Sequence, residues 1–182
     1  MDDRTLIYKI QRGQKELLNE IAEKYYDDIY RFCCYLTGQR EDSYDLAQET
    51  FLKFIRYVEH YRYRNLKGYL LTIARNVCMD YLRQEKSGFL TVLAGEPEED
   101  SVCRGAKEES RDEISELVER QFFWEELRKL SQNQREALIL YYYSGMKIRE
   151  IAAITGVSIS TVKSRLRQGM EKMKKSMEEN DK

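Results

Sequence analysis

The sequence predicts an all-α fold made of two small helical domains, and composition, charge and apolar spacing all point to it. Only 9 Gly and 1 Pro occur in 182 residues, too few turn-forming residues for a β-sandwich or barrel of many strands. A hydrophobic share of 42% is enough to bury a core, and 35% charged residues require a large solvated surface. Over long stretches, apolar side chains recur every three to four residues, which is the spacing of amphipathic helices.

An acidic segment divides the chain. Residues 86–120 carry 5 basic and 10 acidic groups, a net charge of −5, together with three glycines and the only proline. Such a composition is typical of an irregular connection. We therefore predict a first domain at residues 1–86, an acidic flexible linker at 87–119 and a second domain at 120–182.

Charge is distributed unevenly although Lys plus Arg (31) and Asp plus Glu (32) nearly balance. Residues 1–54 have a net charge of −3, residues 55–85 of +3 and residues 121–182 of +4. Basic stretches on both sides of an acidic one indicate a protein that meets polyanions at two separated sites.

Three amphipathic helices are predicted before the linker. The first covers residues 17–36 and ends at Gly38. Asp42 or Ser43 is predicted to cap the second helix, and Asn65 the third. The predicted inward positions of the second helix are Leu46, Ala47, Thr50, Phe51, Phe54, Ile55 and Val58. Those of the third are Leu66, Tyr69, Leu70, Ile73, Ala74, Val77, Cys78, Tyr81 and Leu82.

Residues 57–64, between the second and third helices, interleave tyrosines with arginines. Single-stranded nucleic acid is held by base stacking on aromatic rings and by cations along its backbone, so this pattern favours single-strand binding. The alternative is structural: the tyrosines cover the end of the helical bundle and the arginines are solvated.

Helices are predicted again after the linker. Residues 115–130 form one helix, and Ser131 with Gln134 resembles a capping box at the start of the next. That next helix ends at Gly145, and its predicted inward positions are Leu138, Ile139, Tyr141 and Tyr142.

A helix-turn-helix pattern follows. A short helix over residues 148–154 leads to Gly156, which permits a sharp turn, and Ser158 caps a second helix. The predicted buried side of that second helix consists of Val162, Leu166 and Met170. Gly169 costs about 1 kcal/mol of helix propensity there, and we expect it to fray the end of the helix.

The second helix of this motif is strongly basic. Residues 158–175 carry six lysines and arginines against Glu171 alone. Side chains in its first turns are expected to reach base edges or phosphates in the DNA major groove, and the later lysines to contact the backbone. A solvated amphipathic helix is the alternative, but the one-signed charge after a helix-turn-helix pattern favours DNA binding.

The residue types suited to catalysis or metal binding are not arranged for it. Cys33, Cys34, Cys78 and Cys103 lack Cys-x-x-Cys spacing and are predicted to be buried, reduced thiols. His60, the one histidine, has no partner at ligand spacing. We predict no metal site, no cofactor and no enzymatic activity.

The sequence also predicts a cytoplasmic protein without membrane insertion. No window approaches the roughly 18 uninterrupted apolar residues of a membrane span. The acidic start, Met1 to Arg4, lacks the basic and apolar regions of a signal peptide.

Three motifs, in this order, resemble those of the bacterial extracytoplasmic-function (ECF) sigma factors, the two-domain class of RNA polymerase specificity subunits. Residues 45–54 resemble the polymerase-binding helix of this family, and residues 66–83 its downstream-promoter (−10) helix. Residues 130–138 and 151–167 resemble its upstream-promoter (−35) domain.

The resemblance implies a role for each set of residues. Contacts with the largest polymerase subunits would come from Asp45, Gln48, Glu49 and Lys53. Contacts with the opened downstream element would come from Tyr61, Arg64, Lys67, Tyr69, Thr72, Asn76, Asp80 and Arg83, with Asn76 near a flipped base. Contacts with the upstream element would come from Arg149, Ser158, Ser160, Thr161, Lys163, Ser164 and Arg167.

The resemblance further implies that the chain binds core RNA polymerase, recognises and melts promoters, and initiates transcription of a stress or envelope regulon. An anti-sigma factor would be a further partner. The acidic linker would extend toward the active-site and RNA-exit channels of the polymerase, or serve as a plain solvated spacer.

Two other classes of function are open. A helix-turn-helix transcription regulator with an unrelated N-terminal sensing domain explains the second domain equally well, but it leaves the pattern around Asp45 and Asn76 unexplained. An enzyme that uses Cys33, Cys78 or His60 is the other alternative, although no residue pairs with them in the sequence.

Overall fold

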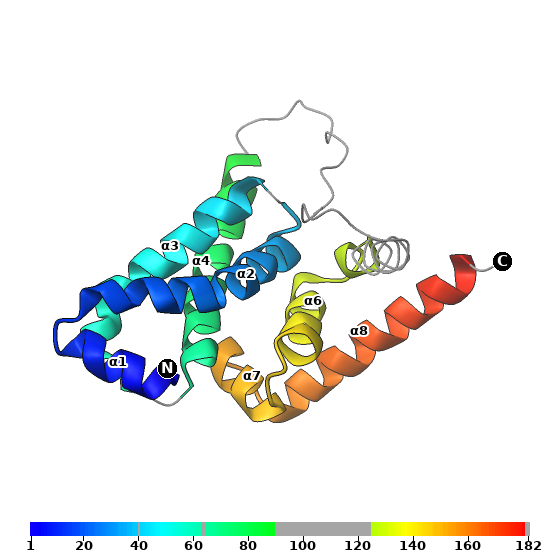
Figure 1. Cartoon of the computed structure of the whole chain (residues 1–182). Helices are drawn as coiled ribbons and strands as arrows, with labels where there is room; N and C mark the ends of the chain where they lie inside the picture. The colour runs from blue at the N-terminus through cyan, green and yellow to red at the C-terminus, as the bar shows by residue number, and fades with distance from the viewer. Residues whose placement is uncertain (40, 63–64, 90–124, 181–182) are drawn as a thin grey trace, which may run out of the picture. The chain divides into compact units, whose positions relative to one another are not determined.

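The computed structural model describes residues 1–39, 41–62, 65–89 and 125–180 (Figure 1), and it divides into two compact units, Met1–Glu99 and Asp100–Lys182. All regular secondary structure in these ranges is helical, which confirms the predicted all-α class. The predicted linker at 87–119 lies mostly outside the described residues, so the domain limits of the sequence analysis stay a prediction.

The first unit is built on three long helices that pack against one another. Its elements are α1 (Asp3–Gln11), η1 (Lys15–Leu17), α2 (Leu18–Thr37), α3 (Glu41–Tyr57), η2 (Val58–His60) and α4 (Leu66–Phe89). Each of α2, α3 and α4 contacts the other two. Their shared core includes Ile29, Phe32, Phe54, Leu70 and Ala74, all at most 1% exposed.

Local signals at two helix ends work as predicted. Gly38 ends α2 in the left-handed region, at φ 80°, where a residue without Cβ is favoured. Asn65 caps α4, since its Oδ1 accepts a hydrogen bond from Gly68 N at 3.1 Å. The predicted cap of α3 is wrong: the helix begins at Glu41, so Asp42 and Ser43 lie inside its first turn. Their side chains bind elsewhere, Asp42 to Tyr81 and Ser43 to the carbonyl of Gln39.

One predicted core position of α3 is wrong. Ile55 is 45% exposed, whereas Phe54, one residue before it, and Val58, three residues after it, are almost completely buried. Phe54 and Val58 are four residues apart and therefore share one helical face. Ile55 lies about 100° around the helix from Phe54 and falls on the side away from the core.

Helix α1 was not predicted. Leu6, Ile7 and Ile10 bury one face of it against the three-helix core. Their spacing of one and three residues is a helical signal, but it extends over less than two turns, too short to separate it from other apolar runs.

In the second unit, the elements within residues 125–180 are α6 (Gln132–Leu138), η3 (Ile139–Tyr143), α7 (Ile148–Thr155) and α8 (Ile159–Asn180). Residues 125–128 are also helical, while the rest of the helix predicted at 115–130 lies outside the described residues. Arg135 closes the end of that helix: its guanidinium donates to the carbonyls of Leu127 at 3.0 Å and Arg128 at 2.9 Å. Burial lowers the pKa of Arg135.

The capping box predicted at Ser131 is absent. The Ser131 side chain makes no capping bond, and the Gln134 amide donates instead to Gln168 of α8 at 3.2 Å. Ser131 starts α6 through its extended backbone, and its carbonyl accepts from Arg135 N at 2.9 Å.

The predicted inward positions Tyr141 and Tyr142 are exposed, by 37% and 57%. They lie in η3, a π-helical turn in which Ser144 N donates to Ile139 O, five residues back, at 2.9 Å. A π turn holds more residues than an α turn, so side chains within it and beyond it are rotated around the axis relative to the spacing of an α-helix. The buried set is therefore Leu138, Ile139 and Leu140.

The helix-turn-helix forms as predicted, with α7 ending one residue later than expected. Gly156 makes the turn at φ 68°, and Ser158 Oγ accepts from Thr161 N at 3.1 Å at the start of α8. The buried positions of α8 include Val162, Leu166 and Met173, while Met170, predicted to be buried, is 42% exposed.

Gly169 lies where α8 packs closely against α6. A Cβ at this position would lie 3.0 Å from Cδ1 of Leu138 and 3.5 Å from Cβ of Gln134. Glycine therefore lets the two helices pack closely, and α8 continues to Asn180 instead of fraying at Gly169 as expected.

We expect Gly169→Val to lower the free energy of unfolding of the second unit by about 1–3 kcal/mol, because the new side chain overpacks the contact with Leu138. Denaturant unfolding followed by circular dichroism measures the change. Met170→Val is the matched control, since it adds the same β-branched residue at an exposed neighbouring position. Valine has a higher helix propensity than glycine, so a loss in Gly169→Val cannot come from propensity. A loss in Gly169→Val no larger than that in Met170→Val would show that the contact with Leu138 is not overpacked.

Cys33, Cys34 and Cys78 are buried free thiols, as predicted, whereas Cys103 lies outside the described residues. Hydrogen bonding between Cys33 and Cys78, together with burial, raises the pKa of the Cys33 thiol. Among the residues described, no group of three or more possible metal ligands is found, and no helix is long and apolar enough to cross a membrane.

Candidate polymerase-binding and DNA-binding surfaces

The solvent side of α3 displays a polar face. Asp45, Gln48 and Glu49 are exposed on it, as their spacing of three and four residues requires. Lys53, half-buried, forms an ion pair with Glu49 at 2.9 Å. Such an exposed pair along one helix contributes only about 0.3–0.5 kcal/mol, so both side chains can exchange it for other partners.

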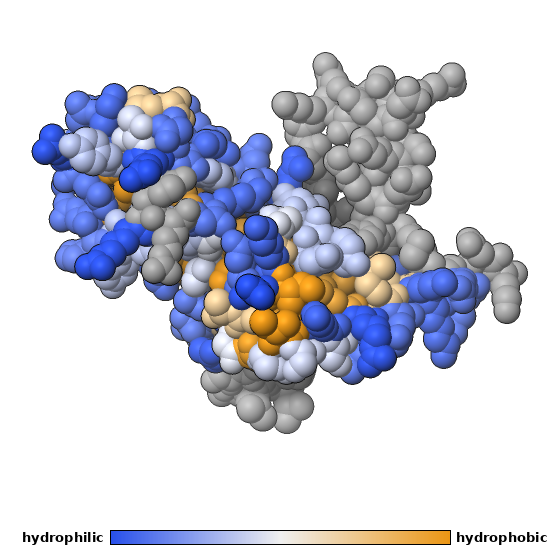
Figure 2. Space-filling view, turned by 90° about the horizontal axis from the view of Figure 1, so that it is seen from below, coloured by the Kyte–Doolittle hydropathy of each residue, from blue (hydrophilic) through white to orange (hydrophobic). Residues whose placement is uncertain are grey.

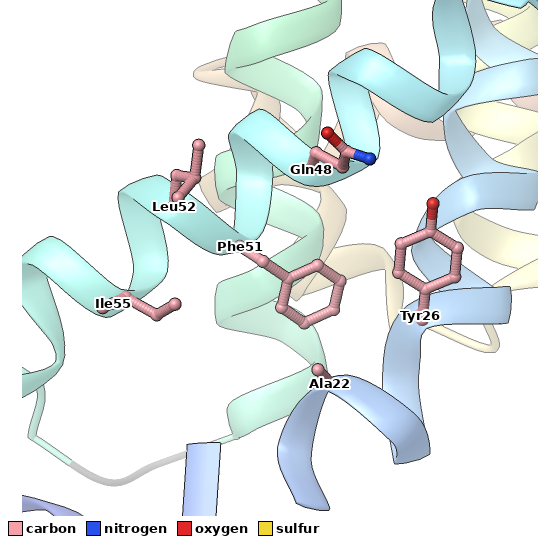
Figure 3. Close-up of a pocket in the computed structure, with 6 residues that line it drawn as sticks. All are labelled: Ala22, Tyr26, Gln48, Phe51, Leu52 and Ile55. Carbon is pink, nitrogen blue, oxygen red and sulfur yellow. The ribbon is translucent and has the colours of Figure 1, made fainter. Parts of the chain in front are cut away.

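Beside this polar face lies an apolar groove between α2 and α3 that the sequence analysis did not predict (Figure 3). Leu52 and Ile55, 64% and 45% exposed, form its outer part. The full lining is Ala22, Tyr26, Gln48, Phe51, Leu52 and Ile55. Gln48 therefore belongs both to the groove and to the polar face.

Aromatic rings extend the same surface along α2. Tyr26 lies 6.0 Å from Phe51 and 6.4 Å from Tyr30, centroid to centroid, and Tyr30 stacks on Tyr44 at 4.4 Å. Burial raises the pKa of Tyr26. An acidic and amide face next to exposed aliphatic and aromatic side chains has the composition of a protein–protein interface.

The α4 side of the first unit presents a different chemistry. Tyr61 stacks on Tyr69 of α4, with centroids 4.5 Å apart and an interplanar angle of 26°. Tyr69 in turn meets the ring of Phe54 edge-on at 6.3 Å. Burial raises the pKa of Tyr69. Both tyrosines remain partly exposed, so the pair forms an aromatic platform at the start of α4.

The polar residues predicted on α4 bind different kinds of partner. Lys67 Nζ lies 2.6 Å from Asp28 Oδ2 of α2, a partner not foreseen from the sequence. The Thr72 hydroxyl donates to the carbonyl of Gly68 at 2.8 Å, within its own helix.

Farther along α4, Asn76 is exposed, and Asp80 pairs with Arg83 at 2.9 Å on the surface. Arg64 lies outside the described residues. The structure thus gathers the described members of the predicted set on α4 and on the segment that precedes it.

The second unit presents the start of α8 with its hydroxyl groups clustered. Ser158 Oγ lies 2.8 Å from both Ser160 Oγ and Thr161 Oγ1. Ser164 accepts from Gln168 Nε2 at 3.1 Å one turn later.

Three cations, Arg149 of α7 and Lys163 and Arg167 of α8, are exposed. No ion pair involving them is found among the residues described. Hydrophobic residues gather at the α7 end of this unit and hydrophilic residues continue along α8 (Figure 2). The described structure therefore keeps all seven predicted residues on or next to the helix-turn-helix.

Two family models match the chain, one within the first unit and one within the second. The model described as Sigma-70 region 2 matches residues 21–88, and that described as Sigma-70, region 4 matches residues 123–173. The ECF RNA polymerase sigma factor SigM of Bacillus subtilis (strain 168) is 30% identical over 160 residues, covering 86% of this chain and 93% of SigM. The chain belongs to the ECF RNA polymerase sigma factors.

A further relative agrees with this membership, and two solved structures share the fold. The ECF sigma factor BldN of Streptomyces coelicolor (strain ATCC BAA-471 / A3(2) / M145) is 26% identical over 161 residues, 87% of this chain and 60% of BldN. A structure of the sigma factor RpoE with the anti-sigma factor NepR, from Bartonella quintana, has a TM-score of 0.70 at 24% identity, covering 88% of this chain and 96% of that chain. CnrH in complex with the cytosolic domain of CnrY has a TM-score of 0.69 at 20% identity, covering 97% of each chain.

As an ECF sigma factor, the chain is a transcription initiation factor that directs RNA polymerase to promoters. The alternative of an unrelated N-terminal sensing domain is wrong, because region 2 of the sigma factors accounts for residues 21–88.

Proposed function

We propose that this sigma factor binds core RNA polymerase through α3, holds the opened downstream promoter element on α4, and reads the upstream element with α8. The observation that carries the proposal is that the first unit has two surfaces of different chemistry. The acidic and apolar surface lies on α3, whereas the aromatic platform lies on α4 and the segment before it. Two partners of different chemistry can therefore bind the unit at once.

On α3, Asp45, Gln48 and Glu49 supply charge and hydrogen-bond acceptors, while the neighbouring groove supplies apolar area. Lys53 pairs with the Glu49 carboxylate, and a partner on the polymerase can replace it because the pair is weak. A mixed surface of this kind suits a reversible complex, since it is not so apolar that the free protein aggregates. We assign it to the clamp of the largest polymerase subunits.

On α4, the Tyr61–Tyr69 platform offers ring faces to unpaired bases. Asn76 lies about two turns beyond Tyr69 along the helix, and we assign it to a flipped base. Extrusion of a base costs a few kcal/mol, which stacking and a shaped site offset. Lys67 is available to a phosphate, because its exposed pair with Asp28 is weak enough to be displaced.

On α8, the hydroxyl cluster at Ser158, Ser160 and Thr161 and the cations that follow it face one groove of the upstream element. Short side chains at the start of a recognition helix let its backbone approach the base edges closely, and Lys163 and Arg167 then reach phosphates or guanine.

Further proposals concern the setting of the protein. We place it in the cytoplasm and assign it no catalytic activity of its own. We propose the domain limits 1–86, 87–119 and 120–182. The genes that it transcribes would form a stress or envelope regulon. An anti-sigma factor is the proposed negative regulator, by analogy with the NepR complex of RpoE.

Run-off transcription with purified core RNA polymerase on genomic fragments tests the proposed function. We expect discrete transcripts that require the full chain and that vanish with Asn76→Ala. A protein that activates transcription only when the housekeeping sigma subunit is also present would contradict the assignment. Recovered transcripts identify the promoter that the following experiments use.

A fragment that comprises Met1–Glu99, a compact unit by itself, should bind the non-template single strand of the downstream element more tightly than the same duplex. Base stacking on the aromatic platform is available only to unpaired bases, and each stacked base is worth about 1–3 kcal/mol. Fluorescence anisotropy with the strand and its duplex measures the difference. Equal or tighter duplex binding would remove the platform from promoter melting.

A further inference from the structure

Helix α1 is attached to the rest of the first unit at both ends. At its start, Asp3 accepts a hydrogen bond from the Tyr25 hydroxyl at 2.5 Å and pairs with Lys24 at 2.6 Å, both on α2. Burial and the Asp3 carboxylate raise the pKa of Tyr25 to about 12, so the hydroxyl keeps the proton that it donates even at alkaline pH. At its end, Gln11 contacts the segment that joins α3 to α4.

Gln11 ties together two points of that segment. Its Nε2 donates to the carbonyl oxygen of Val58 at 2.9 Å and to that of Tyr61 at 2.8 Å, so both amide hydrogens are used. Tyr61 N also donates to the Val58 oxygen, at 3.2 Å. The Gln11 side chain is exposed, and ordering it has an entropic cost without much burial in return. The two bonds therefore determine the shape of residues 58–61 rather than the packing of the core.

The shape of residues 58–61 determines where the Tyr61 ring lies. Val58 is 3% exposed, so the core holds one end of the segment. Gln11 holds the other end through the Tyr61 carbonyl. With both ends fixed, the Tyr61 ring stays against Tyr69 at 4.5 Å.

We propose that Gln11 is a positioning residue for promoter binding: it holds the Tyr61–Tyr69 platform in place for unpaired bases without contacting DNA itself. The inference rests on the proposed function, in which that platform stacks on the opened strand. A ring displaced by about 1 Å loses part of its stacking area. The effect of Gln11 is therefore a fraction of the effect of Tyr61, and it disappears when Tyr61 is absent.

The experiment uses holoenzyme assembled from core polymerase and the full chain. The probe is a fluorescent fragment of a promoter recovered by run-off transcription, with its downstream element single-stranded on the non-template strand. Gln11→Met keeps the length and helix propensity of the side chain but removes both donors. Gln14→Met, the same change at an exposed glutamine three residues on, is the matched control.

We expect Tyr61→Ala to weaken probe binding by about tenfold or more. Gln11→Met should weaken it by about threefold to fivefold, and Gln14→Met should leave it unchanged. The double variant Gln11→Met with Tyr61→Ala should bind no more weakly than Tyr61→Ala alone, because residues that act through one another are not additive. Core-polymerase affinity and the thermal unfolding midpoint should stay at the values of the unaltered chain.

The outcomes separate the inference from the proposed function. Unchanged binding by Tyr61→Ala would overturn the role of the platform itself. A large loss with Tyr61→Ala and none with Gln11→Met would overturn the inference alone. An equal loss from Gln11→Met with and without Tyr61 would also overturn it, since Gln11 would then act by another route.

Discussion

Asp45→Ala combined with Glu49→Arg should lower the affinity for core RNA polymerase by about 10- to 100-fold while the fold remains intact. Loss and reversal of charge at a complementary interface cost about 2–5 kcal/mol where the groups become desolvated, and less at a solvated rim. The fold should tolerate both changes because both side chains are exposed and the ion pair of Glu49 with Lys53 lies on the surface. A titration of labelled protein with core polymerase measures the affinity.

The matched control is Glu178→Ala with Glu179→Arg near the end of α8, which changes net charge by the same amount on another exposed surface. If the control weakens binding as strongly, general charge rather than the α3 surface is responsible. A further variant, Leu52→Ala, tests the groove: Leu52 is 64% exposed, so its loss should affect the complex more than the free protein. Unchanged affinity in both α3 variants would remove this helix from the interface.

Lys163→Ala should change the base preference of the upstream domain, whereas Lys174→Ala should change only its affinity and salt dependence. Lys163 is exposed in the second turn of α8, five residues after the Ser158 cap. Lys174 lies eleven residues later, about 16 Å along the helix axis, where the helix has left the base edges. It is 79% exposed and lies 4.0 Å from Glu178, a pair that a phosphate can easily replace.

The two variants should differ in the size of their effects on binding as well as in which DNA sequences are affected. Removing a base-edge contact costs about 1–3 kcal/mol and relaxes preference at one promoter position. Removing a phosphate contact weakens all sequences alike and makes the salt slope shallower by about one unit. Binding of each variant to the promoter and its single-base substitutions, at several salt concentrations, measures both. A shift of base preference in Lys174→Ala alone would mean that α8 enters the groove differently.

The long helices and several helix ends were predictable because their causes are local. Gly38 and Gly156 end helices in the left-handed region, and Asn65 and Ser158 cap helices with bonds three residues long. Such signals need no information about the rest of the chain. The family was predictable for a similar reason, since its motifs are short and occur in order along the sequence.

Helix orientation was less predictable, because it depends on what packs against each face. Ile55 and Met170 fit an apolar spacing and yet are exposed. Tyr141 and Tyr142 are exposed because they lie within a π turn, and a local apolar count cannot show an extra residue in a turn. Gly169 was expected to weaken α8 because glycine has a low helix propensity, but its missing side chain lets α6 pack closely there.

The sequence by itself determined the fold class, several helix ends, the family and most of the residues proposed to bind polymerase and DNA. The tertiary structure alone decided which distant residues support them: the groove between α2 and α3, Asp28 against Lys67, and Gln11 against Val58 and Tyr61. These contacts join residues from 22 to 50 positions apart, taking Tyr26 with Gln48 as the closest of them and Gln11 with Tyr61 as the farthest. Spacing along one helix describes only the near neighbours on that helix, whereas contacts between helices depend on how their faces meet in the packed core.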